Sequence, residues 1–374
     1  MTYFVRKLAG LQWPLMFLVT VLGLFGIFAI YSATWMRDQD FWSRQLIWLV
    51  LGLFVCVGVA LTDYRWIRRG ALPVYLGALV GLVAVHLIGK TVYGSGSWLD
   101  FGIMSFQPSQ LAILAGIMLM ALFLSDREDM PAPLRIALCG AIAGLPCILI
   151  LAEPDLGSSL VWLPVVLAML YTARVPARYL LTLILLAVAV IPLMVNFGMR
   201  PYQRQRIITF LDPELDPQGA GWTINQSLTA IGSGGWDGKG FKAENTLNEL
   251  GFLPSTIVHN DFIFSVIGEQ HGFIGGLLLL MAFLALVGLG LYVSLQAKDD
   301  FGRLLGVGVT TLLFTHVFMN IGMTIGVTPI TGLPLPLVSY GGSFVLAVLF
   351  SVGILQSIWV HRGKGRGLGR GWTR

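Results

Sequence analysis

The chain has 374 residues, of which 56% are hydrophobic and 11% charged, and its mean hydropathy is +0.79. This composition excludes a soluble globular domain and a disordered chain, because runs of about 20 apolar residues are typical of helices that cross a bilayer. The formal net charge is +5, and the three cysteines and five histidines show neither disulfide nor zinc-site spacing.

Ten apolar segments are long enough to be membrane-spanning helices, which predicts an all-α polytopic membrane protein with one integral membrane domain over residues 1–374. Arg6 and Lys7 precede the first segment as they would in a signal peptide. That segment lacks a clear cleavage site and nine more follow, so we expect it to be retained. The predicted spans are 13–36, 44–62, 71–90, 108–125, 133–151, 158–173, 178–197, 261–296, 303–327 and 337–360.

Lys and Arg residues are distributed unequally between the two sides of these spans. With the N-terminus inside, 16 of the 24 lie on the inner side. The positive-inside rule then places both termini in the cytoplasm and the long loop of about 198–260 outside. The basic tail, 361–374, is expected to contact anionic lipid rather than nucleic acid. Thirteen of the 19 acidic residues lie at the outer face, where we expect any chemistry.

The outer loop contains a candidate surface helix and a glycine-rich stretch. Ile224, Leu228 and Ile231 recur at helical spacing and form one apolar face. The stretch "GSGGWDGKG" can turn tightly and approach a ligand closely. A structural cap over the helix bundle is the alternative interpretation of this loop.

Acidic residues stand at two outer helix ends. Asp261 opens the eighth span, either as a helix N-cap or as a general base facing an outer cavity. Glu269, about 12 Å further along a helix, is expected to be a buried polar organiser of the cavity. Glu153 and Asp155 flank a proline between the fifth and sixth spans, where Asp155 could cap a helix or border a polar cavity.

Arginines and prolines complete this outer region. Arg200, Arg204 and Arg206 begin the long loop, and arginine side chains match phosphate oxygens, although ordinary contact with lipid headgroups is the alternative. The segment "GVTPITGLPLPLVSYGGS" joins the last two spans with irregular backbone, which at membrane depth requires protein or a polar cavity around it.

Four long segments resemble the SEDS family (shape, elongation, division and sporulation), most closely its RodA branch. They are "FLDPELDPQGAGWTINQSLTAIGSGGWDGKGF", "PDLGSSLVW", "NDFIFSVIGEQHGFIGG" and "PITGLPLPLVSYGGS", in the family's order. The resemblance implies a peptidoglycan glycosyltransferase in the bacterial cytoplasmic membrane that polymerises lipid II on the outer face. It also implies a class B penicillin-binding protein as partner.

The family's essential aspartate falls on Asp261, which the resemblance makes the general base of an inverting transfer. The leaving undecaprenyl pyrophosphate needs positive charge, from arginine side chains or from a divalent cation such as Mg²⁺ or Mn²⁺. The expected substrate-binding residues are Arg200, Arg204, Lys239, Asp155, Trp98, Gln110 and Ser339.

The sequence departs from the family pattern at "GSWLDFGIMSFQPSQLAIL" and at "LPSTIVHND". Ser97 stands where Arg is usual, Gln110 where Glu is usual, and Ile113 where Lys is usual. Ser255 replaces a further Glu. Because a paired Glu and Lys are absent together, no charge is stranded. Two alternatives to a polymerase are a flippase for a lipid-linked precursor and an inactive scaffold for the penicillin-binding partner.

Overall fold

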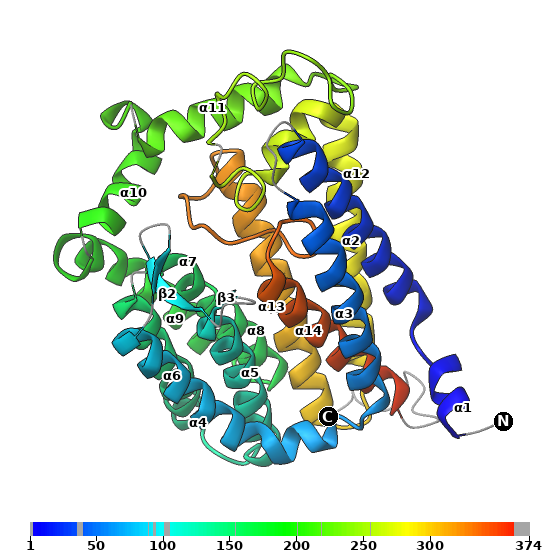
Figure 1. The fold of residues 1–374 in the computed structure, drawn as a ribbon. Helices are drawn as coiled ribbons and strands as arrows, with labels where there is room; N and C mark the ends of the chain where they lie inside the picture. The colour runs from blue at the N-terminus through cyan, green and yellow to red at the C-terminus, as the bar shows by residue number, and fades with distance from the viewer. Residues whose placement is uncertain are drawn as a thin grey trace.

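A computed structural model describes residues 3–35, 40–88, 90–92, 95–100, 105–153, 155–199, 201–217, 219–254 and 256–362. Within these ranges the chain is almost entirely helical, with one small three-stranded antiparallel sheet (Figure 1). Nine of the described helices are long and apolar enough to cross a membrane.

The elements follow one another as a helical bundle interrupted by short connections. The first half contains α1 (Tyr3–Ala9), α2 (Trp13–Thr34), α3 (Phe41–Leu61), α4 (Arg65–Ile88), β1 (Lys90–Val92), β2 (Ser95–Asp100), β3 (Ser105–Phe106), α5 (Pro108–Asp126), α6 (Ala132–Ala152), α7 (Leu156–Leu160) and α8 (Trp162–Thr172). The second half contains α9 (Ala177–Leu193), a π-turn η1 (Met194–Gly198), α10 (Pro201–Leu211), a 3₁₀ turn η2 (Pro213–Leu215), α11 (Ala220–Ser233), α12 (Ile263–Leu295), α13 (Asp300–Thr324) and α14 (Gly342–Val360).

The predicted spans match nine of these helices closely, and the sixth differs. The segment predicted at 158–173 is divided at Val161 into α7 and α8, which together cover Leu156–Thr172. This pair is shorter than the nine candidate spans. Asp155 caps α7, as one of the two interpretations of this residue predicted, whereas the division at Val161 lies within an apolar run and gave no hydropathy signal.

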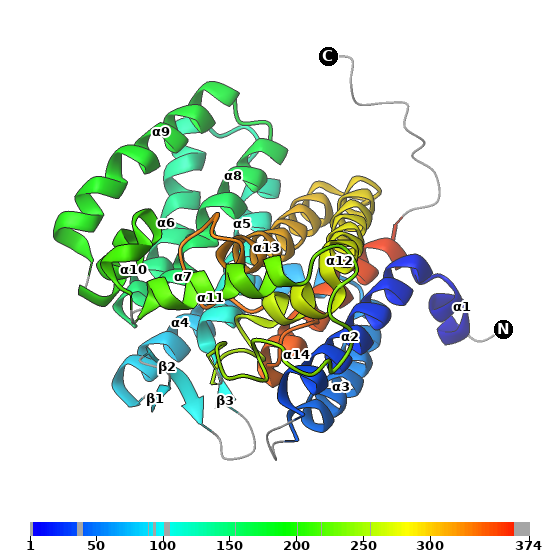
Figure 2. The same ribbon diagram turned by 90° about the horizontal axis from the view of Figure 1, so that it is seen from above.

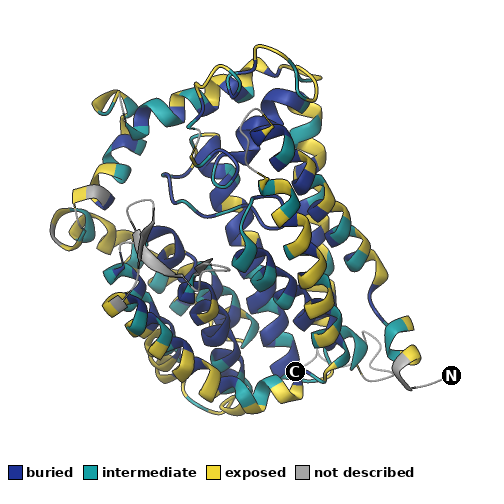
Figure 3. Ribbon diagram, viewed as in Figure 1, coloured by how far each residue is buried: buried dark blue, intermediate teal, exposed yellow. Residues whose placement is uncertain are grey.

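The core is centred on α5, α13 and α14, which are the most enclosed of the long helices (Figure 3). Helix α14 packs against α3 at glycine positions that bring the two helices close together. A Cβ atom on Gly52 would lie 2.3 Å from Leu349, and one on Gly353 would lie 2.9 Å from the backbone of Cys56. Small residues at such crossings are typical of helix packing inside membranes.

Helices α10 and α11 form an arch across one end of the bundle, between α9 and α12 (Figures 1 and 2). The predicted amphipathic helix is confirmed as α11, and protein covers part of its apolar face. Ile224 packs with Phe262, Met323 and Ile330, whereas Leu228 remains 43% exposed. The buried hydroxyl of Ser227 lies 2.7 Å from the Ser265 hydroxyl and 2.7 Å from the Thr324 carbonyl, which fixes α11 to α12 and α13.

Helix α12 is broken at Gly272, whose φ of 61° is a left-handed conformation that favours glycine. The backbone groups released by the break pair with the glycine-rich stretch 232–240. The amides of Lys239 and Gly240 donate to the carbonyls of Glu269 and Gln270, at 3.0 and 2.9 Å. In return, the amides of residues 273 and 274 donate to the carbonyls of residues 235 and 236, at 2.8 and 3.1 Å. The glycines therefore allow this stretch to approach the backbone of α12 closely. The sequence by itself had suggested that they allow close approach to a ligand.

Candidate active site around Asp261

Asp261 lies in a turn immediately before α12 and does not cap the helix. The N-cap residue of α12 is Phe262, and no side chain caps this helix end. The Asp261 amide donates to the Ile257 carbonyl at 2.9 Å, so the backbone is fixed. Its carboxylate forms no hydrogen bond with the part of the chain that the structure describes, and the residue remains partly exposed. The N-cap interpretation is therefore wrong, and the carboxylate is available to a ligand.

Three charged side chains from distant segments surround this point. Asp261 from the start of α12, Arg206 from α10 and Asp155 from the start of α7 are close enough to interact electrostatically. The pKa of Asp261, which precedes the membrane-spanning helix, is raised from 3.8 to about 6. Loss of water around the carboxylate is the largest cause; the positive charge of Arg206 opposes it and the negative charge of Asp155 adds to it.

Asp155, by contrast, is fully engaged by its neighbours. Its carboxylate accepts hydrogen bonds from the Ser158 amide at 2.9 Å, the Ser158 hydroxyl at 2.7 Å and the Gln107 side-chain amide at 2.9 Å. Burial raises the pKa of Asp155, while these hydrogen bonds and Arg206 oppose the rise. Asp155 therefore caps α7 and contacts Gln107, whereas the Asp261 carboxylate forms no hydrogen bond with the described residues.

The proline-rich segment 325–341 forms one wall beside Asp261. Oδ2 of Asp261 lies 3.5 Å from the place where a Cβ atom on Gly332 would stand. Asn320, which is fully buried on α13, donates from its side-chain amide to the carbonyls of Asp261 and Leu333, at 3.0 and 2.8 Å. Arg206 donates to the Ile330 carbonyl at 3.1 Å, so this wall also holds the cation.

Ser339 belongs to the support of the site. Its fully buried hydroxyl donates to the Asn260 carbonyl at 2.5 Å and accepts from the Leu335 amide at 2.8 Å. Both of these hydrogen bonds are internal, so Ser339 positions the turn before Asp261 and does not face the open side of the carboxylate.

Lys239 and Glu269 form a buried ion pair at the break in α12. Their Nζ and Oε1 atoms are 2.7 Å apart, and the same Oε1 accepts from the Leu247 amide at 2.7 Å. The Glu269 side chain is fully buried and that of Lys239 is 28% exposed. Glu269 thus organises the glycine-rich stretch, and the charge of Lys239 is matched by Glu269.

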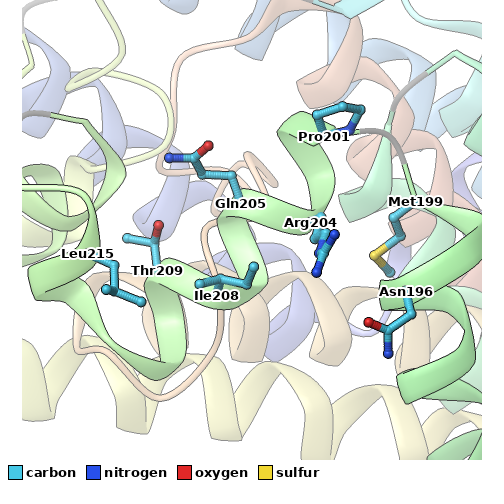
Figure 4. Close-up of a pocket in the computed structure, with 8 residues that line it drawn as sticks. All are labelled: Asn196, Met199, Pro201, Arg204, Gln205, Ile208, Thr209 and Leu215. Atoms are coloured by element: carbon cyan, nitrogen blue, oxygen red, sulfur yellow. The ribbon is translucent and has the colours of Figure 1, made fainter.

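Arg204 faces a pocket of about 410 Å³ beside α10 and η1 (Figure 4). Figure 4 shows it on the side of α10 toward Met199 and Asn196. Because positions two apart on a helix point about 200° apart, Arg204 and Arg206 occupy opposite faces of α10. The lining of this pocket does not include Asp261. Arg200 and the Trp98 side chain, both predicted to bind substrate, lie outside the part of the chain that the structure describes.

The family departures on α5 fall at buried positions. Ile113 is fully buried among apolar side chains, and Gln110 is 9% exposed in the first turn of the helix. An apolar residue where a Lys is usual therefore leaves no unpaired charge. Glu153 is 3% exposed at the C-cap of α6, close in sequence to Asp155.

Sequence reasoning did not select Arg206, Gln107 or Asn320 as site residues. Arg206 was visible only as the third arginine of its loop, and its approach to Asp261 depends on the arch formed by α10 and α11. Gln107 and Asn320 lie in other segments and act through hydrogen bonds that no local pattern shows.

Comparison with known proteins identifies the architecture. The sequence pattern of the family described as "Cell cycle protein", which covers FtsW, RodA and SpoVE, matches residues 11–364. The chain belongs to the FtsW/RodA/SpoVE family. Among curated members, "Peptidoglycan glycosyltransferase MrdB" of Escherichia coli K12 is 37% identical over 350 residues, covering 93% of this chain and 94% of that protein. "Peptidoglycan glycosyltransferase RodA" of Treponema pallidum is 30% identical, covering 95% of this chain and 98% of that protein.

Solved structures of this family share the fold. Rod shape determining protein RodA of Thermus thermophilus superimposes with a TM-score of 0.71 at 27% identity, covering 95% of this chain and 98% of that one. A chain of a peptidoglycan synthase complex, described as coordinating polymerization and crosslinking, gives a TM-score of 0.82 at 30% identity and covers 95% of this chain and 99% of that one. The predicted family is confirmed.

Proposed function

We propose that this protein is a peptidoglycan glycosyltransferase that polymerises lipid II into glycan strands, with Asp261 as general base. The observation that carries the proposal is the contrast between two neighbouring carboxylates. Asp155 is held by three hydrogen bonds, whereas the Asp261 carboxylate is partly exposed and forms none with the described residues. The names of the curated relatives support the same activity.

In this mechanism, Asp261 accepts the proton of the acceptor sugar's 4-hydroxyl. The freed oxygen forms a bond to the anomeric carbon of the donor from the side opposite the leaving group, which inverts that carbon. The bond from the anomeric carbon to the pyrophosphate oxygen breaks, and undecaprenyl pyrophosphate departs. A base with a pKa of about 6 is largely ionised at neutral pH, yet it is a stronger base than an ordinary Asp.

Positive charge for the departing pyrophosphate comes first from Arg206, the cation that interacts with both Asp155 and Asp261. Arg204 and Arg200 precede Arg206 on the same loop and are weaker candidates, since Arg204 occupies the opposite face of α10 beside a pocket that does not include Asp261. Lys239 is a weaker candidate because Glu269 already pairs with it.

A divalent cation remains part of the proposal. Carboxylate oxygens are the donors that Mg²⁺ and Mn²⁺ prefer, and Asp261 retains oxygens that could share an ion with a pyrophosphate. When bound there, the ion would supply charge to the leaving group. Omission of Mg²⁺ and addition of a chelator test this requirement.

The proposed topology has ten spans, with both termini cytoplasmic and the loop of about 198–260 outside. The α7–α8 pair is the sixth crossing, because its 17 residues correspond to about 26 Å of helix, near the lower limit for a span. The candidate site then faces outward. The partner is a class B penicillin-binding protein, in agreement with the polymerization and crosslinking described for the related complex.

The deciding experiment measures glycan strands formed from purified lipid II by the protein together with its partner. We expect polymer from wild type and from Asp237→Asn, an exposed acid of the outer loop, and none from folded Asp261→Asn. Full activity in Asp261→Asn would reject the base assignment but not the polymerase. If wild type forms no polymer, the polymerase fails. Transbilayer movement of labelled lipid would then support a flippase, and normal rod growth with Asp261→Asn would support a scaffold.

A further inference from the structure

A second charged site lies at the end of the bundle opposite Asp261, where α5 ends, α6 begins, α8 ends and α13 begins. It is a pocket of about 280 Å³, close to the smallest volumes typical of ligand sites. We call it the basal pocket. Its charged lining consists of three arginines and three acids: Arg135, Arg174, Arg303, Glu128, Asp129 and Asp300.

Arg135 gives this pocket an unsatisfied donor. The side chain is only 7% exposed, and one terminal nitrogen donates to the Ala173 carbonyl at 3.1 Å. Its buried Nε has no hydrogen-bond partner among the described residues. A guanidinium N–H removed from water without an acceptor is unfavourable, so the described residues satisfy Arg135 incompletely, and Arg135 is one of the residues that line the pocket.

Arg174 adds a second guanidinium, at a position where the backbone is left-handed. Its φ is 59°, in the left-handed region where glycine would be relaxed. The chain nevertheless has a long basic side chain here, and that side chain lines the basal pocket. Arginine forks are suited to the oxygens of a phosphodiester.

The acidic side of the pocket is only partly neutralised. Asp300 pairs with Arg303, whereas Glu128 and Asp129 line the same pocket without an ion pair among the described residues. The neighbouring Asp300 carboxyl raises the pKa of Glu128, and an ammonium group with N–H donors would offset the repulsion between these carboxyl groups.

The balance of charge selects the class of ligand. Three positive and three negative side chains match a zwitterion better than an anion or a cation alone. The pocket lies at the ends of apolar helices, the level at which lipid headgroups are found. The adjoining surface is apolar, with Leu134, Leu138 and Tyr171 exposed by 47%, 37% and 71%, so acyl chains have a surface to follow.

We propose that the basal pocket binds the headgroup of phosphatidylethanolamine, with the phosphodiester on Arg135 and Arg174 and the ammonium between Glu128 and Asp300. The site is independent of the chemistry at Asp261, because it lies at the other end of the bundle.

The test measures lipid retention by native mass spectrometry and thermal stabilisation in detergent, with dioleoyl phosphatidylethanolamine, phosphatidylcholine or phosphatidylglycerol added to the full-length protein. We expect retention and stabilisation with phosphatidylethanolamine. Phosphatidylcholine cannot donate N–H hydrogen bonds and phosphatidylglycerol has no ammonium, so both should bind about tenfold more weakly. Equal retention of all three lipids would overturn the proposal.

Variants of exposed residues separate the pocket from general lipid contact and avoid disturbing buried Arg135. Glu128→Gln and Arg174→Ala should each weaken retention of phosphatidylethanolamine by about tenfold. Arg69→Ala is the matched control, because Arg69 stacks on Trp66 and is absent from the pocket lining. Unchanged retention in both pocket variants refutes the site. Soluble phosphoethanolamine should compete only weakly, and binding of it without binding of the lipid would refute the lipid as occupant.

Discussion

Replacing Asp261 by Asn should abolish polymerisation and also stabilise the fold above pH 6. The folded-state pKa of about 6 exceeds the ordinary value of 3.8, so ionising this carboxyl is less favourable in the folded protein than in the unfolded chain. At roughly 1.4 kcal/mol per pKa unit, the difference destabilises the ionised folded protein by about 3 kcal/mol. Below about pH 3 the group is protonated in both states and contributes nothing.

The neutral amide has almost the same shape as the carboxylate and does not ionise. The Tm of Asp261→Asn should therefore equal that of wild type near pH 3, exceed it increasingly up to about pH 6, and stay above it by a constant margin at pH 7 to 8, as measured by thermal unfolding in detergent. Asp237→Asn, at an exposed position, should show no such divergence. The polymerisation rate should fall by at least a hundredfold, since general base catalysis contributes about 10²–10⁴. A variant that is less stable than wild type at pH 8 would refute the reasoning.

Three further changes test the surroundings of the site. Arg206→Met removes the charge that lowers the pKa of Asp261, so the acidic limb of the pH–rate profile should move to higher pH while polymerisation slows by about tenfold or more. Gly332→Ala adds a Cβ 3.5 Å from the Asp261 carboxylate at a φ of +72°, and should cost about 1 kcal/mol of stability and reduce kcat; an unchanged kcat would argue against this wall. Lys239→Met strands the buried charge of Glu269 and should destabilise the protein by about 3–5 kcal/mol in thermal unfolding, whereas Lys239→Met with Glu269→Gln should recover most of the loss if the pair is structural.

The sequence predicted the spans well because a span is recognised from the mean hydropathy of consecutive residues, without knowledge of contacts between distant segments. Nine described helices coincide with predicted spans, since apolar runs determine helix length in a bilayer, although α4 begins six residues before its predicted start and α14 five residues after. The division of the sixth span at Val161 was missed because both halves are apolar.

The candidate site was less predictable because its geometry depends on long-range folding. Asp261 could be selected from its position and from the family resemblance. Arg206 could not be separated from Arg204, because only the direction of α10 decides which arginine faces the carboxylate. Asn320 acts from a different helix, and the pairing of Lys239 with Glu269 required the break in α12.

The break at Gly272 has a consequence for engineering the outer loop. Four backbone groups of α12 pair with residues 235–240, and in a lipid environment each unpaired group costs several kcal/mol. Deleting or exchanging the glycine-rich stretch would therefore impair insertion and assembly of the whole protein. Loss of activity in such chimaeras would report misfolding, and only substitutions that preserve this backbone can assign a catalytic role to the loop.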